Sequence, residues 1–178
     1  MTVTFSVWCI PLAKLTVRET TLFSVLGAMT FAAKYVMSPL PNIEPVSLMV
    51  MVFGSVFGKK GLYPVYLYVI LELLFYGLGT WNIMYLYIWA ILAMAAYLLR
   101  DMEQPLSWAL LSGTFGLLFG AMCAPVDMAI GGFEYALAKW ISGIPFDIAH
   151  CIGNFIIALA LFHPIRRLTQ KLCGRNDK

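Results

Sequence analysis

Three polar residues near the C-terminal end of the chain, Asp147, His150 and Asn154, have a spacing that could do chemistry. Positions i, i+3 and i+7 lie on one face of an α-helix, here a helix expected to begin near Pro145. A carboxylate next to an imidazole could transfer protons, bind a metal ion or hold a polar ligand. Residues 155–162, which follow, are wholly apolar. The pattern predicts a membrane helix whose outer half lines a site.

Each of the three residues also has a structural interpretation. Asp147 could cap its helix, because carboxylates satisfy the free amides of a helix N-terminus, and His150 and Asn154 could join neighbouring helices. The sequence lacks the further residues that catalysis would need. The only other histidine, His163, lies at the opposite end of the helix, and the sequence has no HExxH, GxSxG or phosphate-loop motif. We therefore expect no catalytic residue, no metal site and no cofactor, and interpret the three residues as substrate contacts.

The composition indicates an all-α integral membrane protein. Of the 178 residues, 61% are hydrophobic and only 12% are charged, and the apolar residues form long blocks. A soluble domain of this size does not need so much apolar area. The four cysteines are isolated, which favours neither a zinc site nor a disulfide framework. We expect the lipid bilayer, and no nucleic acid, as a partner.

Hydropathy predicts six membrane-spanning helices in a single domain. They cover about residues 20–37, 46–57, 62–79, 84–99, 106–124 and 145–163. The second would be only about 18 Å long, so it must be tilted, extended or shielded by its neighbours. Residues 1–18 are predicted to form an interfacial segment and 165–178 a basic tail, with Pro164 ending the last helix. The segment 125–145, interrupted by Gly131-Gly132, is predicted to form an external cap, either an interfacial helix or a re-entrant loop.

The basic residues are distributed unevenly between the two sides of this arrangement. One side receives ten of them, namely Lys14, Arg18, Lys59, Lys60, Arg100, Arg166, Arg167, Lys171, Arg175 and Lys178. The other side receives only Lys34 and Lys139. The positive-inside rule then places both termini in the cytoplasm.

With this orientation, polar and aromatic residues gather in the outer half of the membrane. Glu72 lies deep in the third span, where a carboxylate is costly unless it is paired. We expect Glu72 to share one outer cavity with the polar face of the last helix and to pair with His150, Asn154 or a ligand. The predicted substrate-binding residues are Asn42, Glu44, Glu72, Tyr76, Trp81, Asn82, Tyr85, Trp89, Trp140, Asp147, His150 and Asn154.

Small residues four positions apart form a stripe along the first span. Ser24, Ala28 and Ala32 would let another helix approach closely. The stripe could pack against the protein's own helices or serve a separate partner, and the sequence leaves both alternatives open.

Taken together, these features resemble one known family, the S components of bacterial energy-coupling-factor transporters. The resemblance lies in the six short spans, the small-residue stripe, the loop Leu40-Pro-Asn-Ile-Glu-Pro45 and the stretch from Gly143 to Phe155, which reads Gly-Ile-Pro-Phe-Asp-xx-His-xx-Gly-Asn-Phe. It implies a substrate-capture subunit for a vitamin or related micronutrient in the bacterial plasma membrane. Ser24, Ala28 and Ala32 would then contact a transmembrane coupling protein that works with two cytoplasmic ATPases, while Asn42 and Glu44 would form part of a lid.

Two other classes of function remain as alternatives. The chain could be a small membrane enzyme that uses Asp147 and His150 on a lipid-like substrate, or a structural subunit without a ligand. The sequence names neither the substrate nor the kind of energising module, which could be shared or dedicated.

Overall fold

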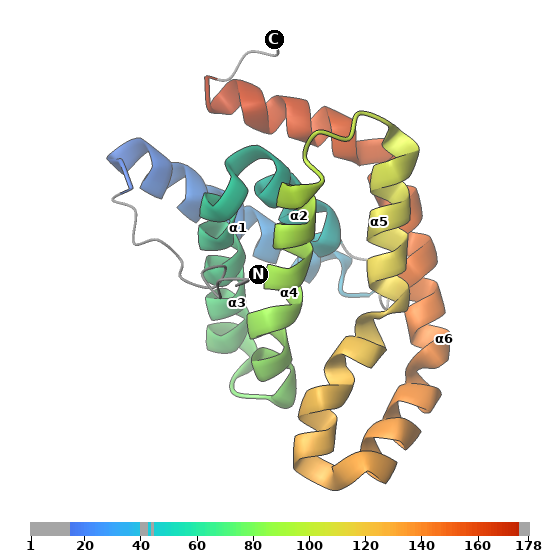
Figure 1. Ribbon diagram of the computed structural model, residues 1–178. Coiled ribbons are helices and arrows are strands. Elements are labelled where there is room, and N and C mark those ends of the chain that lie inside the picture. The colour runs from blue at the N-terminus through green and yellow to red at the C-terminus, as the bar shows by residue number, and fades with distance from the viewer. Residues whose placement is uncertain (1–14, 40–42, 44, 175–178) are drawn as a thin grey trace, which may run out of the picture.

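The computed structural model describes residues 15–39, 43 and 45–174, and within these ranges it is helical and has no strand. Four stretches are long and apolar enough to cross a membrane, namely Val17–Met37, Val46–Tyr76, Thr80–Leu98 and Pro105–Leu172. The elements in chain order are α1 (Val17–Met37), α2 (Val46–Phe57), the short 3-10 helix η1 (Gly58–Gly61), α3 (Leu62–Tyr76), α4 (Thr80–Leu98), α5 (Pro105–Leu117) and α6 (Phe119–Leu172). Figure 1 shows their arrangement.

The short helix α2 lies at the centre of the bundle and has the bounds that the sequence predicts. Val46, Val50 and Phe53 are all fully buried, and α2 packs against α4, α6 and α1. Gly54 lies against the backbone of Ala93 in α4, so that a side chain here would collide with the Ala93 carbonyl group. A helix that is apolar all round is a buried helix. Neighbouring helices therefore shield this short segment.

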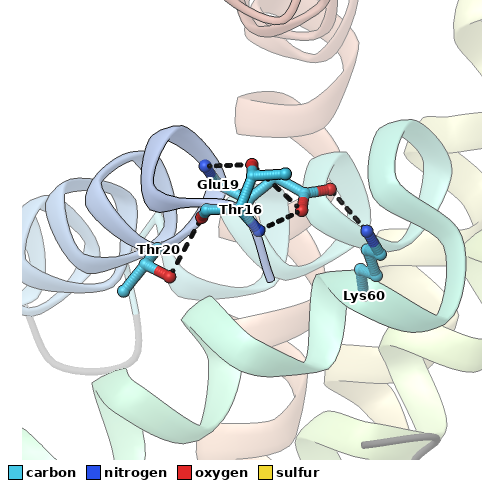
Figure 2. Close-up of polar contacts among 4 residues, drawn as sticks. All are labelled: Thr16, Glu19, Thr20 and Lys60. Carbon is cyan, nitrogen blue, oxygen red and sulfur yellow. Dashed lines mark hydrogen bonds and ion pairs between the residues drawn. The ribbon is translucent and has the colours of Figure 1, made fainter. Parts of the chain in front are cut away.

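The beginning of α1 is held by local and long-range polar contacts (Figure 2). Thr16 caps the helix, because its hydroxyl accepts from the Glu19 backbone N–H at 3.2 Å while Glu19 Oε2 accepts from the Thr16 N–H at 3.0 Å. Lys60 of η1 donates from Nζ to Glu19 Oε1 at 2.5 Å. Of the predicted interfacial segment 1–18, residues 17 and 18 belong to α1, and residues 1–14 lie outside the described ranges.

The segment 125–145 differs from the expected cap. It is helical and forms the far ends of two antiparallel arms within α6, which reverses at Gly132 (Figure 1). Gly132 has φ 82° and ψ 178°, a conformation that is open to glycine and strained for other residues. Pro125 and Pro145 lie inside the arms, and Pro145 does not begin a helix. Prolines are tolerated in membrane helices because neighbouring groups satisfy the backbone that they leave unpaired.

The prediction that Pro164 ends the last helix was also wrong. The helix continues to Leu172, and after Pro164 it changes direction and runs from the beginning of α5 across the end of the bundle toward the beginning of α1 (Figure 1). Two side-chain contacts hold this last part. Arg166 donates to the Arg100 carbonyl at 2.7 Å, and Arg18 of α1 donates to the Leu172 carbonyl at 2.9 Å. The predicted basic tail therefore begins as a helix.

Candidate functional site

A cavity of about 450 Å³ lies where the beginning of α4 meets the two arms of α6. It is lined by Thr80, Trp81, Met84, Tyr85, Phe119, Gly120, Cys123, Asp127, Lys139, Trp140, Ser142, Gly143 and Phe146. Its volume falls within the range of small-molecule sites, which is about 300–1,000 Å³. We call it the aromatic cavity.

Four aromatic side chains supply the walls of the aromatic cavity. Trp81 and Tyr85 come from the first turns of α4, Phe119 begins α6 and Trp140 lies on the returning arm. Three of them (Trp81, Tyr85 and Trp140) are among the residues that the sequence predicts for the site. Flat aromatic walls favour planar ligands, which can stack on them or meet them edge to face.

An ion pair at the aromatic cavity joins the two arms of α6. Lys139 Nζ lies 2.5 Å from Asp127 Oδ1, and the side-chain exposures are 45% for Lys139 and 5% for Asp127. Lys139 also lies over the Tyr135 ring, 5.7 Å from its centre. The sequence-based interpretation did not assign either charged residue to the site. Asp127 and Lys139 lie on either side of Gly131-Gly132 in the sequence. A chain reversal at these glycines brings the two charges together, so this spacing could have predicted the pair.

A second and deeper ion pair joins α1 to α3. Lys34 Nζ lies 2.7 Å from Glu72 Oε2, with side-chain exposures of 18% and 6%. We expected His150, Asn154 or a ligand to be the partner of Glu72, and that expectation missed Lys34. A lysine within an apolar span costs as much free energy to bury as a carboxylate does, and this cost could have pointed to Lys34. Two isolated opposite charges in neighbouring spans are therefore candidates for a pair.

Tyr85 connects the buried ion pair to the aromatic cavity. Lys34 Nζ lies 3.5 Å from the Tyr85 hydroxyl and 5.2 Å from the centre of its ring. Tyr85 also packs against Trp89, with ring centres 5.5 Å apart. Trp89 is fully buried and packs against Phe119 at 5.7 Å, so it lies behind the cavity wall.

Of the three polar residues of α6, Asp147 and His150 contact the first arm of the same element, and Asn154 contacts α2 and α5. Asn154 donates to the Ser47 hydroxyl at 2.9 Å and to the Ser112 carbonyl at 3.3 Å. His150 packs edge-on against Phe119 at 5.1 Å. Asp147 Oδ1 accepts from the Gly120 N–H at 3.1 Å, so it caps the first arm of α6 and not a helix of its own. Neither Glu72 nor these three residues line the aromatic cavity, which differs from the single shared cavity that we expected. Contacts through Lys34, Tyr85 and Phe119 nevertheless link Glu72 to His150.

Several buried polar atoms in this layer have no hydrogen-bond partner within the described part of the chain. They are Glu72 Oε1, Trp89 Nε1, His150 Nε2 and Asp147 Oδ2. Each of these side chains belongs to a residue that is at least nine-tenths buried. A buried polar group left unpaired costs about 1–3 kcal/mol, and native proteins contain few of them. The layer has hydrogen-bonding capacity that a ligand or ordered water could fill.

Comparison with known proteins does not extend this description. No protein-family model matches the chain, and neither a curated protein nor a solved structure is significantly similar to it. The chemistry of the site has to be argued from its own residues.

The remaining predicted residues lie elsewhere or outside the description. Tyr76 is half exposed and packs against Phe31 and Phe75. Asn82 caps α4, because its side-chain oxygen accepts from the Gly79 N–H at 2.7 Å. Asn42 and Glu44 lie outside the described residues.

Asp147 and His150 share no hydrogen bond within the described residues. In the same part of the chain, no three His, Cys, Asp or Glu side chains come together as metal ligands would.

The small-residue stripe of α1 lies on the outside of the bundle. Ser24, Ala28 and Ala32 are all exposed, while Phe23, Leu26 and Gly27 on the other faces are buried. The stripe therefore does not pack against the described helices of its own chain.

Proposed function

We propose that this chain is the substrate-capture subunit of an energy-coupling-factor importer in the bacterial plasma membrane. It would bind a vitamin-like small molecule and deliver it through an ATP-driven module. The observation that carries the proposal is the aromatic cavity, backed by a buried layer with unused hydrogen-bonding capacity. The exposed stripe of α1 supports the coupling role, because a close-packing surface outside the bundle suits a partner helix.

We infer six spans with both termini in the cytoplasm. In support, Arg18, Lys59, Lys60 and Arg100 line one common cavity at the opposite end of α4 from Trp81. The positive-inside rule makes that end cytoplasmic. A cysteine at Trp81 should react with an impermeant thiol reagent added to intact cells, and one at Lys60 should not. Labelling at Lys60 would overturn this orientation.

The ligand favoured by the site is a planar heterocycle. Two of the carboxylates near the cavity, Asp127 and Glu72, already have a lysine partner, whereas Asp147 is held by the Gly120 N–H. A strongly charged ligand would therefore lack a free counter-ion at these two positions. Aromatic walls and unpaired donors and acceptors instead suit a ring with hydrogen-bonding edges.

Native mass spectrometry of the purified protein tests the capture function. We expect a small molecule that leaves the protein chemically unchanged and that is largely lost from a Trp140→Ala variant. Tyr76→Ala is the matched control, because it removes an aromatic ring that does not line the aromatic cavity. Equal retention by Trp140→Ala and the wild type would argue against this cavity, and release of a converted product would favour an enzyme.

The coupling role makes a separate prediction about α1. Ala28→Leu should abolish co-purification with the coupling protein and ATPases from host membranes, because a larger side chain holds the partner helix away. Ligand retention should not change. Val25→Leu is the control, because Val25 is also exposed on α1 but lies outside the stripe. A destabilised Ala28→Leu protein, or an intact complex, would contradict the coupling assignment.

A further inference from the structure

The end of the molecule opposite the aromatic cavity contains a second cleft with different chemistry. This cleft, which we call the basic cleft, has a volume of about 750 Å³. It lies between the α4–α5 turn and the last part of α6. Its lining residues are Arg100, Asp101, Met102, Glu103, Pro105, His163, Arg166, Arg167 and Gln170. Three guanidinium groups and an imidazole thus face two carboxylates.

The arginines of the basic cleft differ in how firmly they are held. Arg166 donates to the Arg100 carbonyl and lies over the Trp108 ring, 5.6 Å from its centre, so it belongs to the framework. Arg167 is exposed and takes part in no ion pair with a described residue. Arg100 lies over the Tyr97 ring, 4.8 Å from its centre, and 3.9 Å from Asp101, whose side chain is 93% exposed, while the Arg100 side chain itself is 48% exposed. A surface pair of that length contributes little. Arg100 and Arg167 are therefore able to bind an added anion.

The same region presents an apolar strip beside the basic one. Leu168 and Leu172 are exposed one helical turn apart, and so are Arg167 and Lys171. A helix with adjacent apolar and cationic strips is typical of a segment lying in the membrane interface. Figure 1 shows the last part of α6 lying across the end of the bundle at which α5 begins, as such a segment would.

We propose that the basic cleft binds the phosphate headgroup of an anionic phospholipid. Guanidinium forks match phosphate oxygens, and Arg100 and Arg167 supply two of them. The acyl chains would run along Leu168 and the exposed Leu106 at the beginning of α5. This apolar flank favours a lipid over free phosphate, which would gain nothing from it. The proposal is independent of the transport function, since it uses neither the aromatic cavity nor the stripe of α1.

Lipid retention by the full-length protein tests the proposal. Protein in micelles containing phosphatidylglycerol and phosphatidylcholine in equal amounts is analysed by native mass spectrometry. We expect phosphatidylglycerol to be retained preferentially, and the double variant Arg100→Gln/Arg167→Gln to lower this preference at least about fivefold. Lys59→Gln is the matched control. It removes one exposed charge that does not line the basic cleft and should leave the preference unchanged.

Three results would overturn the proposal. The first is the same preference in the double variant as in the wild type. The second is an equal loss in Lys59→Gln, which would indicate attraction to overall charge. The third is complete displacement of phosphatidylglycerol by inorganic phosphate, which would assign the cleft to a free anion. If the double variant fails to fold, as judged by circular dichroism, Arg167→Gln alone decides the matter, because this side chain is exposed.

Discussion

The two ends of α1 carry ion pairs of almost the same length in very different surroundings. Near the beginning, Lys60 Nζ lies 2.5 Å from Glu19, and the two side chains are 37% and 30% exposed. Near the end, Lys34 Nζ lies 2.7 Å from Glu72, with exposures of 18% and 6%. Water screens the first pair, so its loss is tolerable. The second pair is shielded, so removal of one partner leaves a costly charge behind. The solvent exposure of each pair, more than its N–O distance, determines how much it contributes to stability.

The largest effect is expected at the deep pair. Glu72→Gln should lower the free energy of unfolding by about 3–5 kcal/mol, because the Lys34 ammonium would then face an uncharged amide in a poorly hydrated layer. The double variant Lys34→Met/Glu72→Gln removes both charges and should recover most of the loss. Reversible unfolding in mixed micelles measures both. A double variant no more stable than Glu72→Gln would show that the pair does not act as a unit.

The pair between Asp127 and Lys139 should fall between these extremes and should be asymmetric. Lys139→Gln leaves the buried Asp127 carboxylate without its cation and should destabilise by about 1–3 kcal/mol. Asp127→Asn should cost less, because the Lys139 side chain is 45% exposed and its ammonium can turn to water. The same unfolding experiment compares the two variants. A larger loss of stability in Asp127→Asn than in Lys139→Gln would contradict this prediction, because it would mean that the unpaired lysine is the more costly of the two charges.

The smallest effect is expected at the beginning of α1. Glu19→Gln should leave the unfolding midpoint unchanged within error, because the pair is exposed and glutamine preserves the capping arrangement with Thr16. High salt should likewise change little in the wild type. Thermal unfolding monitored by circular dichroism is sufficient for both. A clear loss of stability in Glu19→Gln would mean that solvent exposure does not explain the difference in strength between the two ion pairs of α1.

Sequence reasoning succeeded where one physical signal dominated. The bounds of α2 follow from an uncharged, largely apolar run between Pro45 and Gly58, and the structure confirms them. Trp81, Tyr85 and Trp140 were predicted to lie together because all three fall at one end of the predicted spans, and they line one cavity.

Prediction failed where local signals conflict with the surroundings. Pro145 and Pro164 are strong local signals for helix ends, yet both lie inside α6 because a packed membrane helix tolerates proline. Lys34 was overlooked for a related reason. Its charge was counted toward topology, while its partner, 38 residues away on another helix, depends on how α1 and α3 pack. Which side chains pair between two helices depends on how the helices pack. A hydropathy profile locates the helices but does not predict their packing.

The hydrogen bond from Arg18 to the Leu172 carbonyl joins residues 154 positions apart. During synthesis, the ribosome has to complete nearly the whole described chain before this contact can form. Until then, the beginning of α1 lacks its contact with the end of α6. Because domains synthesised from the N-terminus acquire their contacts in that order, this bond can form only after residue 172 has been synthesised. A chain that stops before residue 172 would thus lack this contact, and among the described residues the beginning of its first helix would depend on the Glu19–Lys60 pair alone for a long-range polar contact.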